Sequence, residues 1–236
     1  MGSFLWNLFN QDHFLGRVLS RIFDLILLNV VYLVFCIPLV TIGSASSALY
    51  YTTVRMAEGT DVRPLRDFLK GFRENFKAIT PIWLVILAYS ILLGTVFGLN
   101  QQRMWGGDHV GWIYIILITL IVLVILFCEW LFVLQMRFEN TRRELIKNAM
   151  LFLVRFLPSL LLIDTGHIAL LLLALSAPPL YPITIIFGFS LPALLKGYYF
   201  SHIFSKVMVE LKADGESTVA PPNRKENSFP ASNVEE

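Results

Sequence analysis

Long apolar stretches separated by short polar ones make up most of the chain. Four stretches contain no Asp, Glu, Lys or Arg, and they comprise residues 25–54, 79–102, 109–128 and 165–195. A helix needs about 20 apolar residues to cross a bilayer, because the hydrocarbon layer is about 30 Å thick and each residue adds about 1.5 Å. The second and third stretches therefore predict one membrane-crossing helix each, over residues 78–99 and 110–133.

The fourth stretch is too long for one such helix, and prolines divide it. Residues 156–163 extend it across the single charge of Asp164, and the middle of the joined segment contains Pro178, Pro179 and Pro182. Because a proline interrupts helical hydrogen bonding and favours a turn, the segment predicts two spans. These spans are placed at residues 156–177 and 181–200.

The first stretch predicts one span over residues 25–42, interrupted by Pro38 and Gly43 and followed by a run of small residues. Its thirty residues are too few for two complete spans. A re-entrant hairpin broken at Pro38 is the alternative interpretation of residues 25–54. The five predicted spans describe an all-α, polytopic transmembrane helical bundle with amphipathic helices at its interfaces.

The distribution of the basic residues predicts the orientation of these spans. With five spans and the N-terminus outside, 16 of the 19 Lys and Arg residues lie on the inner side and 3 on the outer side. Cytoplasmic loops of membrane proteins carry the excess of Lys and Arg, so we expect a cytoplasmic C-terminus and an external N-terminus. A re-entrant hairpin would move the N-terminus inside and change the counts to 18 and 1.

Residues 64–77 form an amphipathic pattern between two predicted spans. Apolar positions recur there at helical spacing, charged residues occupy most of the others, and the segment contains Phe68, Phe72, Asn75 and Phe76. This pattern predicts a cytoplasmic helix at the membrane surface that leads into the next span. A docking surface for another protein is the alternative. Further along, Thr141 and Glu144 form a capping-box pattern that predicts a helix start.

The composition excludes an ordinary soluble enzyme and a disordered chain. The protein is 56% hydrophobic and only 15% charged, whereas soluble domains carry about 25% charged residues. A formal net charge of +2 with scattered basic residues argues against nucleic acid as a partner. We therefore expect a transmembrane domain over residues 1–212. Residues 213–236 are rich in Pro and charge and predict a disordered cytoplasmic tail.

Sequence motifs for catalysis, cofactors and metals are absent. The chain has no phosphate-binding GxxxxGK[ST] loop, no dinucleotide-binding GxGxxG and no HExxH or CxxC spacing. Its four histidines are far apart in the sequence, at His13, His109, His167 and His202. We therefore expect no enzyme activity, no cofactor and no metal site.

Asp164 is the acidic residue that falls deepest in a predicted span. It lies about 12 Å from the inner edge, and His167 follows three residues later on the same helix face. Together with Asn29 in the first span, these residues form the candidate intramembrane polar site, either as an ion or substrate pathway or as a brace between helices. Glu129 and Lys196 are predicted to be border residues whose side chains reach water.

Small residues predict where helices pack closely. Gly43 and the small residues after it would allow another helix to approach, and Gly94 and Gly98 form a GxxxG pair in the second span. Packing inside the molecule is the interpretation we favour for these glycines. Self-association through Gly94 and Gly98 is the alternative.

The first third of the chain resembles the YesL-like family, which is domain-of-unknown-function family 624 of small bacterial membrane proteins. The resemblance rests on Asp24-Leu25 with Leu28-Asn29, Pro38, Thr41-Ile42-Gly43, Ala48-Leu49-Tyr50-Tyr51, and on Phe68, Phe72, Asn75 and Phe76. It implies a multi-spanning protein of the bacterial plasma membrane, without an assigned activity, that accompanies carbohydrate-uptake systems.

From this resemblance we expect a non-catalytic accessory protein of a carbohydrate-uptake system. Its partners would be the lipid bilayer and either a membrane permease or a second copy of the chain. The alternative is a small transporter or channel that uses Asp164 and His167.

Overall fold

The structure is a computed structural model, and it describes residues 14–105, 111–139, 141–177, 179, 181–213 and 223–224. In these residues the regular elements are helices, apart from two strands of two residues each. The predicted all-α fold is confirmed. The elements are α2 (Phe14–Cys36), the 3-10 helix η1 (Leu39–Thr41), α3 (Ile42–Ala57), α4 (Pro64–Trp105), α5 (Gly111–Arg137), β1 (Phe138–Glu139), α6 (Arg142–Ser176), α7 (Tyr181–Phe187), α8 (Ser190–Ala213) and β2 (Asn223–Arg224).

Four helices within the described residues are long and apolar enough to cross a membrane. They comprise Val18–Cys36 in α2, Pro64–Leu99 in α4, Ile115–Arg137 in α5 and Arg142–Ala169 in α6. Large apolar side chains on these helices face outward, and Val85, Val154 and Leu162 are each more than 70% exposed. Water-soluble monomers rarely expose large apolar patches, so these surfaces fit a lipid environment.

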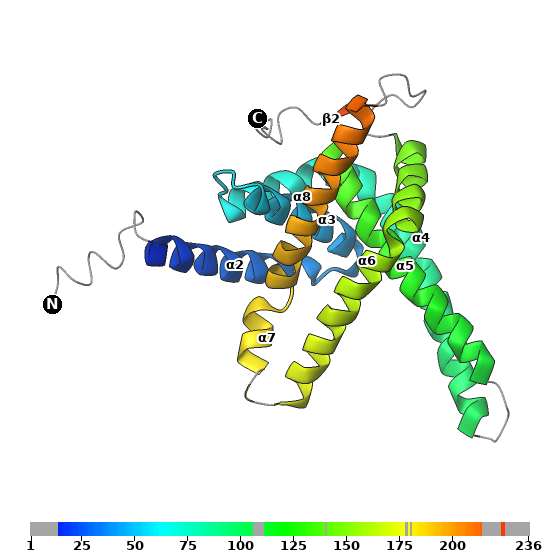
Figure 1. Cartoon of the computed structure of the whole chain (residues 1–236). Helices are drawn as coiled ribbons and strands as arrows, with labels where there is room; N and C mark the ends of the chain where they lie inside the picture. The colour runs from blue at the N-terminus through cyan, green and yellow to red at the C-terminus, as the bar shows by residue number, and fades with distance from the viewer. Residues whose placement is uncertain are drawn as a thin grey trace.

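The ends of the long helices lie at two opposite ends of the molecule. In Figure 1 the end of α4 and the start of α5 lie at the lower end of the molecule, as do the end of α6 and the start of α7. The C-terminal part of α8 and β2 lie at the upper end. Strands β1 and β2 pair there in an antiparallel manner, with Phe138 opposite Arg224. Two residues of the tail predicted to be disordered therefore form a strand, and most of that tail lies outside the described residues.

The predicted span over residues 181–200 is not one helix. Helix α7 ends at Phe187 after seven residues and α8 begins at Ser190. At the break, the Gly188 N–H donates to the Thr184 carbonyl over 2.8 Å, and a β-carbon on Gly188 would collide with that carbonyl oxygen. A larger residue would not fit at this position, and the prolines alone did not predict the break.

The apolar stretch over residues 25–54 folds into two helices rather than one span and a loop. Helix α2 already ends at Cys36, so the predicted end at residue 42 is wrong, and α3 follows η1 directly. Twelve of the 16 residues of α3 are buried, and it packs against α2, α4, α5 and α8. Its hydroxyl groups are satisfied inside the protein: Thr52 donates to the Ala48 carbonyl and Ser47 to that of Phe132. Helix α3 is thus the central helix of the fold.

Helix α2 lies crosswise to α6 and α8 in Figure 1. A helix in this direction does not run parallel to the other candidate spans. The expected external N-terminus therefore stays a prediction, and residues 1–13 lie outside the described part of the chain.

The amphipathic segment 64–77 is the first part of α4 and continues into the apolar part without a break. Phe68 is fully buried, and the ring centroids of Phe35 on α2 lie 5.4 Å from Phe68 and 4.8 Å from Phe72. Asn75 is buried too, and its amide donates to the Gly71 carbonyl over 2.8 Å. The apolar face of this segment therefore packs on the protein's own helices.

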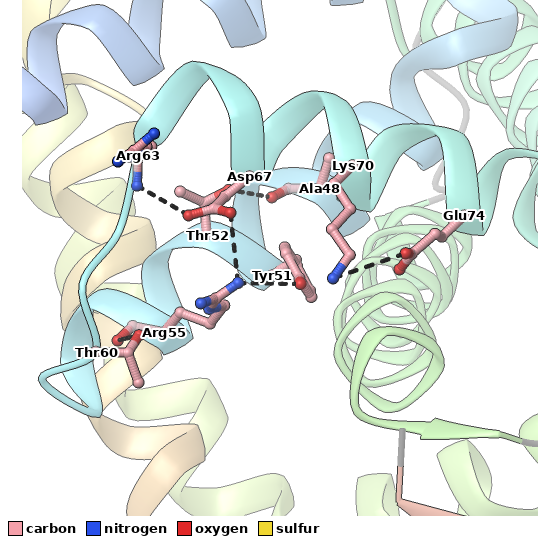
Figure 2. A network of polar contacts seen from close by, with 9 residues as sticks. All are labelled: Ala48, Tyr51, Thr52, Arg55, Thr60, Arg63, Asp67, Lys70 and Glu74. Atoms are coloured by element: carbon pink, nitrogen blue, oxygen red, sulfur yellow. Dashed lines mark hydrogen bonds and ion pairs between the residues drawn. The ribbon is translucent and has the colours of Figure 1, made fainter. Parts of the chain in front are cut away.

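Ion pairs hold the turn between α3 and α4 in place (Figure 2). Arg55 lies 3.4 Å from an Asp67 carboxylate oxygen, and the other oxygen accepts the Arg63 backbone N–H over 2.9 Å. Glu58 accepts from Arg137 at the end of α5 over 2.6 Å.

At the start of α6, the capping box is confirmed: the Thr141 N–H donates to the Glu144 carboxylate over 2.9 Å.

Candidate functional site

Three charged side chains from three helices meet inside the bundle. Lys196 on α8 donates from Nζ both to Glu129 Oε1 on α5 and to Asp164 Oδ1 on α6. Only 5% of the Lys196 side chain is exposed, and 13% of each carboxyl side chain. We call these three residues the charged cluster.

The cluster lies well inside its helices rather than at their ends. Glu129 precedes the end of α5 at Arg137 by eight residues, or about 12 Å of helix. Lys196 is followed by a further 17 residues of α8, which ends at Ala213. The prediction that both are border residues reaching water is wrong. It placed the membrane edge where the uncharged stretch ends, whereas the helices continue beyond that point.

The charges of the cluster do not balance. One ammonium faces two carboxylates, so full ionisation leaves a net charge of −1 in a buried site. Glu129 Oε2 and Asp164 Oδ2 are buried and have no hydrogen-bond partner among the residues that the structure describes. Burying an unpaired charge or an unsatisfied polar atom is costly, so this arrangement needs a reason beyond packing.

A cavity of about 550 Å³ opens beside the cluster, which forms part of its lining. The cavity lies between α2, α3, α4, α5, α6 and α8. Aromatic side chains line much of the rest, and they include Tyr32, Tyr50, Trp83, Phe132 and Phe189. A mostly apolar cavity with a few convergent polar groups is the usual form of a small-ligand site.

The structure separates the three residues of the predicted polar site. His167 lines the same cavity as Asp164, and its Nε2 lies 3.3 Å from the Gly188 carbonyl at the α7–α8 break. Asn29 does not line that cavity. Its Oδ1 accepts the backbone N–H groups of Phe189 and Ser190 over 3.1 and 3.0 Å, so it caps the start of α8.

Sequence reasoning missed Glu129 and Lys196 as partners of Asp164. A signal was present, because each is a single charge flanked by apolar residues, and the two charges are opposite. Their proximity depends on how α5, α6 and α8 pack, which the spacing along the chain does not determine. Within the described residues, no group of three or more His, Cys, Asp or Glu side chains is arranged to hold a metal ion.

The glycines differ in what surrounds them. A β-carbon on Gly43 would lie 2.8 Å from Cβ and Cγ of Trp83, so Gly43 lets α3 approach α4 closely. In the described part of the chain, nothing lies within 4 Å of the corresponding position at Gly94 or Gly98. The predicted internal packing of this pair is therefore wrong, and self-association stays a prediction. A β-carbon on Gly197, which the sequence interpretation overlooked, would lie 2.9 Å from the Thr53 carbonyl oxygen, so Gly197 lets α8 approach α3 closely.

A comparison with protein families bears on about the first third of the chain. The model of the family described as "Protein of unknown function, DUF624" matches residues 25–96. Residues 25–96 are therefore similar to this family. This confirms the resemblance seen in the sequence and covers about half of α2, all of α3 and most of α4. The matched residues include Tyr32, Tyr50 and Trp83 of the cavity lining, whereas the charged cluster lies outside the match. No curated protein and no solved structure matches the chain.

Proposed function

We propose that the protein is a multi-pass membrane protein that binds a small solute in the cavity and passes it across the bilayer. The observation that carries this proposal is the charged cluster, which faces a cavity between apolar helices. Ionisable residues in such helices are costly, face the bundle interior and often mark ion or substrate pathways.

A purely structural role for the cluster explains less. Replacing a buried ion pair by apolar residues of similar size is often neutral or stabilising, so a brace between helices does not need charge. A brace also gives no reason for a second carboxylate, for two carboxylate oxygens without partners, or for the adjoining cavity. A polar binding site accounts for all three.

The break between α7 and α8 supports the same proposal. Phe189 and Pro192, at the start of α8, line the cavity, and His167 contacts the break through Gly188. Transporters commonly place their solute sites at interrupted helices, because a break frees backbone groups and allows movement. Here Asn29 already occupies the freed N–H groups, so the cluster and the aromatic side chains remain for the solute.

We also propose the orientation that the basic residues favour, in the plasma membrane of a bacterium. The end of α5 and the start of α6 would then face the cytoplasm together with the C-terminus. Arg137, Arg142, Arg143 and Lys147 lie in this region, as the positive-inside rule requires of a cytoplasmic loop. The alternative role, an accessory protein in carbohydrate uptake, rests on the family resemblance.

Solute passage can be tested with proteoliposomes in a light-scattering assay. Vesicles are mixed with an excess of sodium chloride, glucose or glycine on the outside, so that water leaves and they shrink. The three solutes represent salts, neutral sugars and zwitterions. We expect at least one solute to restore vesicle volume faster with the wild-type protein than in protein-free liposomes. The Asp164→Asn variant should lose this advantage, because the substitution alters the cluster with little change in size.

Lys70→Met is the matched control for this assay. Lys70 forms an ion pair with Glu74 in the exposed part of α4, at 3.9 Å, and it does not line the cavity. This variant should behave like the wild type. If no solute crosses faster than in protein-free liposomes, or if Asp164→Asn passes solute at the wild-type rate, the proposal fails.

A further inference from the structure

We propose that the charged cluster binds one exchangeable proton, on Glu129 or Asp164, and that this proton completes the charge balance of the site. The inference deepens the proposed function and rests on the same cavity. It follows from the geometry: one ammonium lies between two carboxyl groups, and each carboxyl group keeps one buried oxygen without a partner.

The number of protons follows from the charges. With both carboxyl groups ionised, the cluster carries −1, and with one proton it is neutral. Two like charges that share one site in a poorly polarisable environment do not both ionise readily, so one of them retains its proton. Lys196 keeps its own proton, because two carboxyl oxygens accept from its Nζ. The two carboxyl groups of the cluster should therefore hold one proton between them, while Lys196 stays charged.

Among the described residues, no other group around the cluster supplies the positive charge that would neutralise it. The remaining titratable side chains of the cavity lining are Tyr32 on α2, Tyr50 on α3, Cys128 on α5 and His167 on α6. Tyrosine and cysteine are neutral in their protonated forms. His167 contacts the Gly188 carbonyl rather than a carboxyl group of the cluster. A proton on Glu129 or Asp164 is thus the simplest way to balance the charge.

The cavity gives this proton a route for exchange. Its volume of about 550 Å³ is large enough for several water molecules, and all three residues of the cluster line it. A proton leaving one of the unpartnered oxygens passes to water in the cavity and leaves the cluster with a charge of −1. Uptake of a cationic solute at that moment would restore neutrality, which couples proton release to solute binding.

Infrared spectroscopy of the protein in lipid nanodiscs tests this inference without any solute. A protonated carboxyl group has a carbonyl stretching band that an ionised carboxylate lacks. At neutral pH we expect the wild-type protein to show such a band from one buried carboxyl group. The band should disappear in both Glu129→Gln and Asp164→Asn, because the remaining carboxylate then pairs with Lys196 and needs no proton.

Two controls sharpen the outcome. Glu144→Gln removes an exposed carboxyl group at the start of α6 and should leave the band unchanged. Lys196→Met removes the ammonium, so both carboxyl groups should protonate and the band should grow. If one amide variant does not fold, the other one carries the test.

Three results would overturn the inference: no band in the wild type, a band that survives in an amide variant, or a band that appears only when choline replaces sodium. The last would show that sodium, not a proton, balances the charge. The spectrum does not depend on solute flux. A band without any solute passage would refute the proposed function alone, and solute passage without the band would refute the proton alone.

Discussion

Asn29 shows how a single polar side chain positions an element that is distant in the sequence. It is fully buried, and its Oδ1 accepts from the first backbone N–H groups of α8, about 160 residues further along. The first N–H groups of a helix have no partner within the helix, so a buried start needs such an acceptor. Because α8 carries Lys196, Asn29 also helps to position the Lys196 ammonium in the charged cluster.

Asn29→Ala should therefore destabilise the protein by about 1–3 kcal/mol, since it leaves buried N–H groups without an acceptor. Chemical denaturation in detergent, followed by tryptophan fluorescence, measures this loss. Asn29→Asp keeps an acceptor at the helix start, where a negative group is favourable, and should lose less. Equal stability of the alanine variant and the wild type would show that this contact does not hold α8.

At the scale of elements, α3 and α4 depend on close backbone approach. Gly43 faces Trp83, whose indole N–H donates to the Leu39 carbonyl over 2.8 Å and so holds the ring in place. The ring therefore cannot move away easily when a side chain is added at Gly43. Gly94, on the same helix as Trp83, has open space beside it.

Gly43→Ala should destabilise the protein by about 1–3 kcal/mol, the usual cost of overpacking. Gly94→Ala should be neutral or stabilising by up to about 1 kcal/mol, because alanine is the better helix former and meets no neighbour. Thermal unfolding of both variants in the same detergent compares them directly. The packing account would be contradicted if Gly94→Ala were the more damaging change.

The sequence predicted those elements whose signal is local. Stretches without charge identified the apolar parts of α4, α5 and α6, and Thr141 with Glu144 identified the start of α6. The preferred single-span interpretation did not predict helix α3, because its serines, threonines and small residues resemble a loop until other helices bury them. The break at Gly188 was missed for a related reason, since Asn29 stabilises it from another helix.

The candidate site was predictable only in part. Asp164 and His167 were found, because charge and imidazole are conspicuous in an apolar segment. Their partners were not, because a residue's depth in the bundle depends on helix length beyond the apolar stretch and on packing between helices. Glu129 and Lys196 therefore became recognisable as a pair only in the folded structure.

At the scale of the whole molecule, apolar side chains lie on the surface and charged side chains lie inside. Large apolar side chains face outward along α4, α5 and α6, while the charged cluster lies at the centre beside a cavity. A water-soluble protein has the reverse arrangement. This inversion is the basis for the account of a membrane protein with a polar site inside its bundle.

A double-mutant cycle between Glu129 and Lys196 tests most directly that these charges form one interacting unit. Lys196→Met alone should cost about 3–5 kcal/mol of unfolding free energy, because the buried carboxyl groups lose their counter-charge and must take up protons to be neutral. Lys70→Met, in an exposed ion pair, should cost about 1 kcal/mol or less. With Glu129→Gln and the double variant included, we predict a coupling energy of about 1 kcal/mol or more. If the effects of the two substitutions add to within about 0.5 kcal/mol, the two side chains do not interact and the central site of this account does not exist.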